Sequence, residues 1–268
     1  MEITPRPFGE IIGEGMTMLG RVWRRILAPA FWAFVLLGAA TIAVFALTGA
    51  GDVLQLILND PGALDRMTDA EIGEAGLLLL QAGSVVLLFQ LLASGFLSLT
   101  VHRIVGSELA GEPLGARSAS AQALARLFTL VVAGVIAVVL VTVGLAALIL
   151  PGLWLAGAFS MVSAVIALEG LGPVQALRRS FALVRGRWWP TVGFLLLVGL
   201  FGSVAAQLVQ LVALPIVGAG GVGIGAGLGF VVLVVAQGFV VAAIAVMVTL
   251  WYLDLRARKE PVVISSLR

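Results

Sequence analysis

Long apolar runs separated by short polar segments recur along the whole chain. Six of them lie at about residues 27–48, 77–101, 127–149, 153–168, 191–213 and 226–252. A helix of about 20 residues crosses a bilayer, and the shorter fourth run is tolerated through local thinning of the bilayer. The pattern predicts an all-α integral membrane fold, in which residues 1–268 form one domain with six transmembrane helices.

The polar segment between the fourth and fifth runs, residues 169–190, has the periodicity of a helix. Gly172-Pro173 suits a helix start, and five apolar side chains then follow on one stripe: Val174, Leu177, Phe181, Val184 and Trp188. A basic amphipathic helix of this kind is expected to lie flat in the cytoplasmic membrane interface and to attract anionic lipid. The candidate lipid or partner surface consists of Arg178, Arg179, Arg185, Arg187, Trp188 and Trp189. The alternative is a polar connector whose arginines only fix orientation.

A comparable segment precedes the first run. Its apolar stripe consists of Ile12, Met16, Leu19, Trp23 and Ile26, which predicts a second interfacial helix. A weaker one is expected around 119–128. With these helices the chain is compatible with three repeats of a surface helix followed by two spans.

The distribution of charge predicts the orientation of the spans. All 16 Lys and Arg residues except Arg66 fall in segments on one side of a six-span topology. The positive-inside rule assigns that side, with both termini, to the cytoplasm. On the other side, Thr68 followed by Glu71 predicts a capping box and a helix start. Composition agrees with a membrane protein, because 11% of the residues are charged and soluble domains have about 25%.

A polar stripe runs along the second span. Gln90, Ser94, Ser98 and His102 are spaced four residues apart, which places them on one helical face. They could line a hydrated path or ligand cleft, or they could hydrogen bond across a packing seam. The second reading is favoured, because no charge lies in mid-membrane. Gln207, Gln210 and Gln237 could belong to the same network.

The remaining polar residues indicate structure rather than catalysis. Glu169 and Asp254 lie at cytoplasmic ends of spans, where Arg178, Arg179 or Arg256 can neutralise them as structural ion pairs. There is no cysteine and only one histidine, and no catalytic, cofactor-binding or metal-binding residues are expected. Nucleic acid is not an expected partner, since the cations are scattered among membrane-flanking loops.

Several short motifs resemble the membrane-domain family named after glycerophosphoryl diester phosphodiesterase. They are Leu150-Pro-Gly-Leu-Trp154, Glu169-Gly-Leu-Gly-Pro173, Ala176-Leu-Arg-Arg-Ser180, Leu183-Val-Arg-Gly-Arg187 and Tyr252-Leu-Asp-Leu-Arg-Ala-Arg-Lys-Glu260. The resemblance is sharpest over 150–190 and 252–260 and implies a six-span protein of the bacterial plasma membrane. Some relatives carry a fused phosphodiesterase domain. No counterpart is expected in this chain, so the family name does not imply the activity.

Two functions are compatible with these features. The leading hypothesis is a non-enzymatic scaffold or lipid-associated module at the cytoplasmic leaflet, with anionic headgroups and a protein partner or a second copy as its contacts. The alternative is a transporter or channel for a small or amphiphilic solute, based on the stripe at Gln90 and the repeat. A membrane enzyme ranks third because polar groups are so few. The sequence identifies neither a cargo nor a partner.

Overall fold

A computed structural model of the protein describes residues 8–60, 62–219 and 226–260, and within them the chain forms helices without strands. The helices are α1 (Phe8–Thr48), α2 (Ala50–Asn59), α3 (Ala63–Arg66), α4 (Asp69–Leu109), α5 (Ala116–Ala147), α6 (Ile149–Ala158), α7 (Val162–Glu169), α8 (Pro173–Val184), α9 (Trp188–Ala219) and α10 (Ala226–Ala257). Side chains at 213–232 lie largely outside this description.

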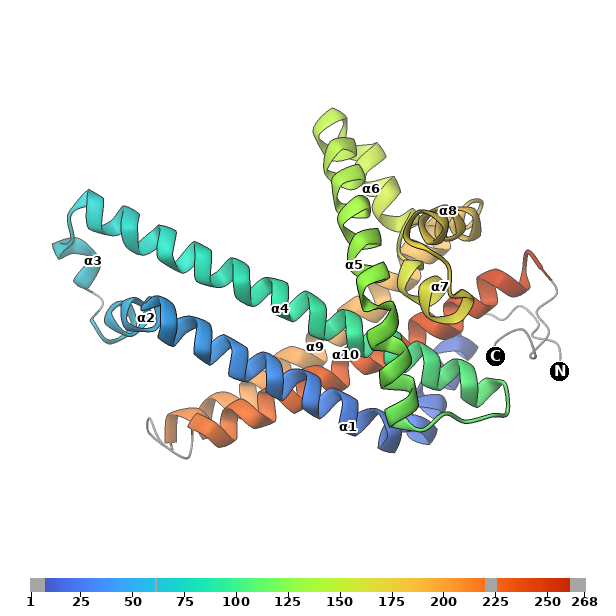
Figure 1. Ribbon diagram of the computed structural model, residues 1–268, viewed down its shortest axis with the longest axis horizontal. Helices are drawn as coiled ribbons and strands as arrows, with labels where there is room; N and C mark the ends of the chain where they lie inside the picture. The colour runs from blue at the N-terminus through green and yellow to red at the C-terminus, as the bar shows by residue number, and fades with distance from the viewer. Residues whose placement is uncertain (1–7, 61, 220–225, 261–268) are drawn as a thin grey trace.

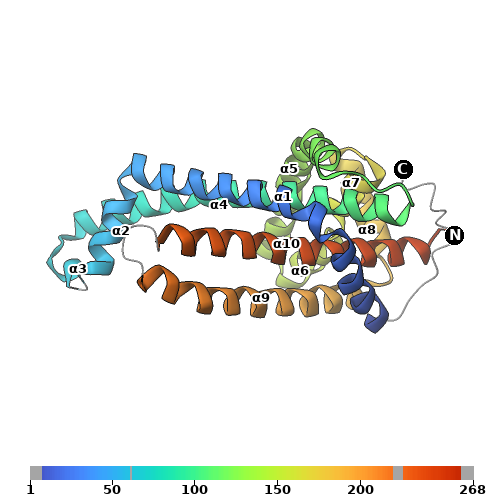
Figure 2. The same ribbon diagram turned by 90° about the horizontal axis from the view of Figure 1, so that it is seen from below.

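The described residues contain six helical segments that are long and apolar enough to cross a membrane. They are α1, α4, α5, α9, α10 and the pair α6–α7, which together cover Ile149–Glu169. The expected all-α fold with six spans is therefore confirmed, and the chain is a multi-pass membrane protein. The N-terminal stripe does not form a separate helix, because α1 continues from Phe8 to Thr48. Its first part nevertheless runs in a different direction from the rest (Figure 2).

The spans are arranged as three hairpins that meet at one end, and the α5–α6 hairpin points away from the other two. Figure 1 shows α5 and α6 rising steeply away from the other spans, whereas Figure 2 shows α9 and α10 running alongside α1 and α4. The end at which the hairpins meet contains the start of α5, helix α8 and the end of α10, and we call it the arginine-rich end. Helices α2 and α3 lie at the opposite end, beyond α1 and α4.

The three hairpins agree with the repeat only in part. A separate surface helix, α8, precedes the third hairpin. The surface helix expected around 119–128 is instead the first part of α5, which runs unbroken from Ala116 to Ala147. Leu148 in extended conformation separates α5 from α6. Pro151 lies in the first turn of α6, where backbone N–H groups have no helical partner and its missing N–H costs little.

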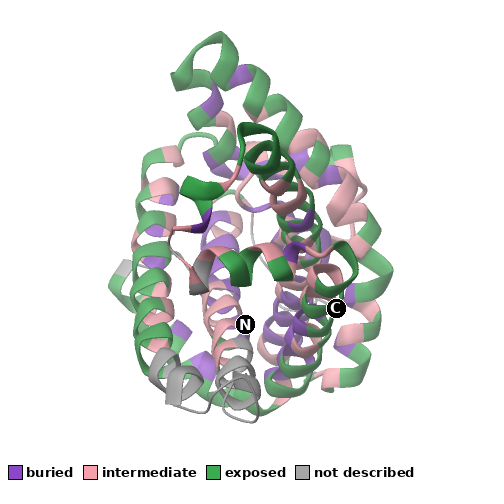
Figure 3. Ribbon diagram, turned by 90° about the vertical axis from the view of Figure 1, so that its left-hand side faces the viewer, coloured by how far each residue is buried: buried purple, intermediate pink, exposed green. Residues whose placement is uncertain are grey.

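Helix α10 occupies the centre of the assembly. In its most apolar stretch 78% of the residues are buried, compared with 6% in α4 and in α5. Large apolar side chains on the other spans point outward, and Leu47, Phe128 and Leu150 are each more than three-quarters exposed. Exposed residues accordingly cover most of the outer helical faces (Figure 3). Such a surface is unsuited to water but suited to lipid, where helices satisfy their own backbone hydrogen bonds.

The connection between α1 and α4, opposite the arginine-rich end, has the structure that the sequence pattern predicts. The Thr68 side chain accepts a hydrogen bond from the Glu71 backbone N–H, and the Glu71 side chain bonds the Thr68 backbone in return. The predicted capping box is confirmed, and α4 begins at Asp69. Arg66, the one cation predicted for this side, pairs with Asp60. The pair neutralises both charges near the end of a span.

Close backbone contact at Gly144 holds the α5–α6 hairpin together. A Cβ atom on Gly144 would lie 2.9 Å from the Cα atom of Gly152, whereas a Cβ atom on Gly134 would meet nothing within 4 Å. We expect Gly144→Ala to lower the free energy of unfolding by about 1–3 kcal/mol through overpacking. Gly134→Ala, in the same helix, should be neutral or stabilising because alanine favours helix by up to about 1 kcal/mol. Thermal melting in detergent measures both, and equal melting temperatures would contradict the tight contact.

Candidate functional site

The last turns of α10 connect most of the other helices at the arginine-rich end. The hydroxyl Oγ1 of Thr249 lies 2.7 Å from Nδ1 of His102 on α4. The indole of Trp251 donates to Thr191 on α9 at 3.2 Å and stacks on Phe194 with ring centroids 4.6 Å apart. These buried contacts come from two positions within one turn of α10, so α10 orients its neighbours from the centre.

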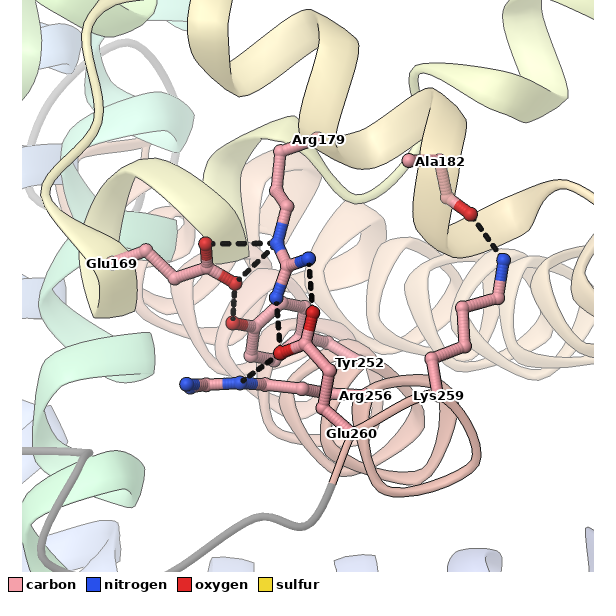
Figure 4. Close-up of polar contacts among 7 residues, drawn as sticks. All are labelled: Glu169, Arg179, Ala182, Tyr252, Arg256, Lys259 and Glu260. Carbon is pink, nitrogen blue, oxygen red and sulfur yellow. Dashed lines mark hydrogen bonds and ion pairs between the residues drawn. The ribbon is translucent and has the colours of Figure 1, made fainter.

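An arginine clamp, formed by Glu169, Arg179, Tyr252 and Glu260, extends this connection to α7 and α8 (Figure 4). Nε of Arg179 donates to both carboxylate oxygens of Glu169 at 3.0 and 2.9 Å. Its Nη1 and Nη2 donate to the two oxygens of Glu260 at 2.6 and 2.8 Å. The Tyr252 hydroxyl donates to Glu169 at 2.5 Å. One guanidinium on α8 thus bridges carboxylates from α7 and from the turn that follows α10.

Local sequence places α8 where Arg179 can reach both acids. Gly170 ends α7 with φ of 67°, a conformation open to glycine, and Pro173 begins α8. The Ser180 hydroxyl donates to the Ala158 carbonyl at 2.7 Å and accepts from the Met161 N–H at 3.2 Å. Ser180 therefore satisfies backbone groups at the break between α6 and α7 and fixes α8 across it. Nothing in the periodicity of the sequence indicated this role.

Charge pairing shifts the ionisation of the clamp in opposite directions. The hydrogen bonds to Glu260 are the largest cause that raises the pKa of Arg179 above its usual range, and contacts with Glu169 add to it. The same hydrogen bonds lower the pKa of Glu260 below its ordinary value of 4.5.

Lys259 Nζ donates to the Arg185 carbonyl at 2.8 Å and also to that of Ala182, which satisfies carbonyls at the end of α8.

The six residues expected to form a lipid or partner surface do not share one surface. Arg179 turns inward to the clamp, whereas Arg178 is exposed and has no hydrogen-bond or ion-pair partner among the described residues. Trp188 donates to the Trp154 carbonyl at 2.9 Å, and Trp189 is 78% exposed. Arg185 and Arg187 flank the turn at Gly186, the former exposed and the latter half-buried.

The apolar stripe of α8 corrects the expectation of a helix lying on lipid. Leu177 and Val184 are buried by protein, and Val174 alone of the stripe is more than half exposed. The small side chains of Ala176 and Ser180 are also fully buried, so α8 packs closely on the helices beside it. An amphipathic pattern indicates that one helical face contacts apolar groups. In the structure these groups belong to neighbouring helices of the protein.

The expected ion pairs are rearranged by helical geometry. Glu169 pairs with Arg179, as described above. Asp254 pairs with Arg258 at 2.6 Å rather than with Arg256, which instead lies 3.8 Å from Glu260. Residues four apart are neighbours on a helix, whereas residues two apart point to different sides. The carboxylate of Asp254 therefore could not adopt the pairing with Arg256 within one helix.

The polar stripe of α4 divides into two environments. His102 is buried, with Nε2 3.1 Å from the Ser163 hydroxyl in addition to its contact with Thr249. Gln90 donates to Ser94 at 3.4 Å and lines a cavity of about 260 Å³, whereas Ser94 and Ser98 do not line it. We call this cavity the glutamine pocket; its polar lining is Thr41, Gln90, Gln210 and Gln237. The stripe is thus a packing seam at His102 and part of a cavity at Gln90.

An apolar groove of about 620 Å³ lies between α1, α4 and α5. Its walls include Trp32, Leu36, Phe89 and Phe96, and among the described residues that line it only Arg117 and Ser120 are polar. These two come from the first turns of α5, so the polar end of the groove faces the arginine-rich end. Arg117 is exposed and has no ion-pair or hydrogen-bond partner within the described ranges.

Comparisons with protein-family models, with curated proteins and with solved structures find no match to this chain. The candidate sites are therefore assigned from geometry and chemistry. In the part of the chain that the structure describes, no three His, Asp or Glu side chains come together as metal ligands. Sequence reasoning missed the groove and the place of Arg117 in it, because a groove between three helices leaves no local signal beyond a single charge.

The clamp predicts that two neighbouring arginines differ in their effect on stability. Arg179→Ala should lower the free energy of unfolding by roughly 2 kcal/mol, since Glu169, only 14% exposed, loses a charged hydrogen-bond donor. Arg178→Ala removes the same side chain from an exposed position and should change it by less than about 0.5 kcal/mol. Chemical or thermal unfolding in detergent measures the difference, and equal losses would show that the clamp does not stabilise the fold.

The pH dependence of stability provides a second test of the contact between Arg179 and Glu260. The folded-state pKa of Glu260 is lowered, so its contribution is complete above its ordinary pKa of 4.5 and is lost as pH falls through the lower folded value. The stability advantage of the wild type over Glu260→Gln should follow that course. An advantage that persisted in acid would contradict the assignment.

Proposed function

We propose that this protein is a non-enzymatic membrane module that holds an anionic lipid at its arginine-rich end. The observation that carries the proposal is the apolar groove with Arg117 at one end. Its volume of about 620 Å³ falls in the range of ligand sites, roughly 300–1,000 Å³. Apolar walls with a cation at the end match the two parts of an anionic lipid, an acyl chain and a phosphate.

Selection among lipids would come from the headgroup rather than the chain. An acyl chain that leaves the bilayer for the groove exchanges one apolar environment for another, so burial alone provides little driving force. An arginine near the membrane surface attracts anionic lipid by about 1 kcal/mol. Arg117 lacks an acid partner among the described residues and is available for this contact. The groove would thus favour lipids by charge.

We further propose that the arginine-rich end lies on the cytoplasmic side of a bacterial plasma membrane and that the groove binds lipid without catalysis. The positive-inside rule places the arginine-rich end in the cytoplasm, and the motif resemblance to the glycerophosphodiesterase membrane-domain family supports a bacterial plasma membrane. Ser120 is the only hydroxyl among the described groove-lining residues and no general base accompanies it, which supports a binding role over a catalytic one. Exposed Arg178 and Trp189 leave a surface for a protein partner.

The glutamine pocket supports a second candidate, passage or binding of a small neutral polar solute. Gln90, Gln210 and Gln237 come from α4, α9 and α10 and meet within the spans. Each carboxamide both donates and accepts hydrogen bonds, and none adds a charge that the membrane would penalise. A pocket of about 260 Å³ suits a molecule of glycerol or urea size.

For the lipid proposal we expect Arg117→Gln to reduce retained phosphatidylglycerol roughly fivefold, the equivalent of about 1 kcal/mol. Ala28→Phe, which introduces a ring at an exposed position of the groove, should displace the lipid without changing charge. Arg21→Gln is the control, because Arg21 is exposed on α1 and lies outside the groove. Native mass spectrometry after extraction from mixed phosphatidylglycerol and phosphatidylcholine vesicles measures bound lipid. Equal retention by Arg117→Gln, or an equal loss in Arg21→Gln, would overturn the proposal.

For the solute candidate we expect vesicles containing the wild type to take up glycerol or urea faster than empty vesicles. Gln237→Leu should abolish the difference, because it removes a carboxamide from the pocket. Gln207→Leu makes the same change at an exposed site on α9 outside the pocket and should have no effect. Stopped-flow light scattering records the uptake. Wild-type vesicles no faster than empty ones would eliminate this candidate.

A further inference from the structure

A third cavity, on the other side of α5 from the groove, is lined by two arginines. It has a volume of about 330 Å³ and lies between α4, α5 and the end of α7. We call it the two-arginine pocket; its polar lining consists of Arg103, Gln122, Arg126 and the backbone at Ala167 and Gly170. It shares no lining residue with the apolar groove, so the two sites can be tested separately.

Both guanidinium groups in the pocket are held by neutral acceptors. Nε of Arg103 donates to the Gln122 side-chain oxygen at 2.6 Å, Nη2 donates to the same oxygen, and Nη1 donates to the Ala167 carbonyl at 3.1 Å. Nη1 of Arg126 donates to the Gly170 carbonyl at 2.9 Å. These bonds fix the orientation of both side chains and leave their charges without compensation.

Several of the other half-buried arginines in the described ranges have a carboxylate beside them. Arg25 pairs with Glu108, Arg179 with Glu169 and Glu260, and Arg258 with Asp254. Glu169 is next to Gly170 in sequence, but its carboxylate is directed to Arg179 and Tyr252. No acidic side chain lines the two-arginine pocket among the described residues.

Two cations in one partly buried pocket repel each other. Arginine has five N–H donors, and Arg126 uses one of its guanidinium nitrogens on Gly170, which leaves donors available. Gly170 also gives Arg126 room, because a Cβ atom there would lie 3.1 Å from its Nη2. An oxyanion between the two guanidinium groups would offset their repulsion. Its oxygens would also accept hydrogen bonds from the free N–H groups, whose paired geometry suits phosphate.

We propose that the two-arginine pocket binds a phosphate-type oxyanion between Arg103 and Arg126. The site lies beside the last turns of α4 at the arginine-rich end. The phosphate group belongs either to an anionic lipid or to a free anion. The chemistry of recognition is the same for both sources. The site extends the proposed function and does not require the groove to hold lipid.

The test uses the full chain, purified in a neutral detergent without anionic lipid. Its probes are inorganic phosphate, short-chain phosphatidic acid and short-chain phosphatidylcholine, each at matched ionic strength. Phosphate or phosphatidic acid should raise the melting temperature of the wild type in a saturable manner, whereas phosphatidylcholine should not. Saturation by inorganic phosphate assigns a free anion, and a response to phosphatidic acid alone assigns a lipid headgroup. A wild type that responds to neither anion overturns the proposal.

Arg126→Gln removes one cation at an exposed position and should weaken binding at least about tenfold, the loss expected for a charged hydrogen bond. Arg126→Lys keeps the positive charge but lacks the planar, paired N–H donors of a guanidinium, and it should give an intermediate affinity. Arg21→Gln, on α1 and remote from the pocket lining, should bind as the wild type does. Melting without ligand shows whether each variant is folded. Unchanged affinity in folded Arg126→Gln, or equal weakening in Arg21→Gln, would overturn the proposal.

Discussion

The arrangement of the spans depends on polar contacts made by the last turns of α10. In lipid, apolar side chains gain little by leaving the surrounding solvent, so helix association requires close packing and hydrogen bonds. Thr249, Trp251 and Tyr252 contact His102 on α4, Thr191 on α9 and Glu169 on α7, respectively. The three hairpins are thereby joined at one end, and the arginine clamp attaches α8 to the same point.

The arginines at that end fall into three electrostatic classes. Some, such as Arg179, are neutralised by carboxylates and hold helices together. Arg103 and Arg126 are held by neutral oxygens and retain their charge inside a pocket. Arg117 is exposed at the end of the apolar groove. The last two classes combine available charge with a cavity, whereas exposed Arg178 on α8 lines neither the groove nor the two-arginine pocket. The proposed binding sites therefore lie around α5.

The clamp joins two distant parts of the chain. The stretches 150–190 and 252–260 contain Glu169, Arg179, Tyr252 and Glu260. These stretches are far apart in sequence but lie side by side in the structure (Figure 4). The two stretches therefore include the residues that fix α7, α8 and α10 together, and they do not include the arginines of the groove or of the two-arginine pocket.

The sequence by itself determined the six spans, the gathering of cations on one side and the capped start of α4, because hydropathy, charge and capping are local properties of the chain. It located the start of α8 and its two faces for the same reason. It did not reveal which partner covers the apolar face, since periodicity is identical for a helix on lipid and a helix on protein. Tertiary structure alone decided that Arg179 meets Glu260 across 81 residues, and that Gln210 and Gln237, but not Gln207, share a pocket with Gln90. Such partners depend on how the hairpins cross, and no short stretch of sequence encodes that geometry.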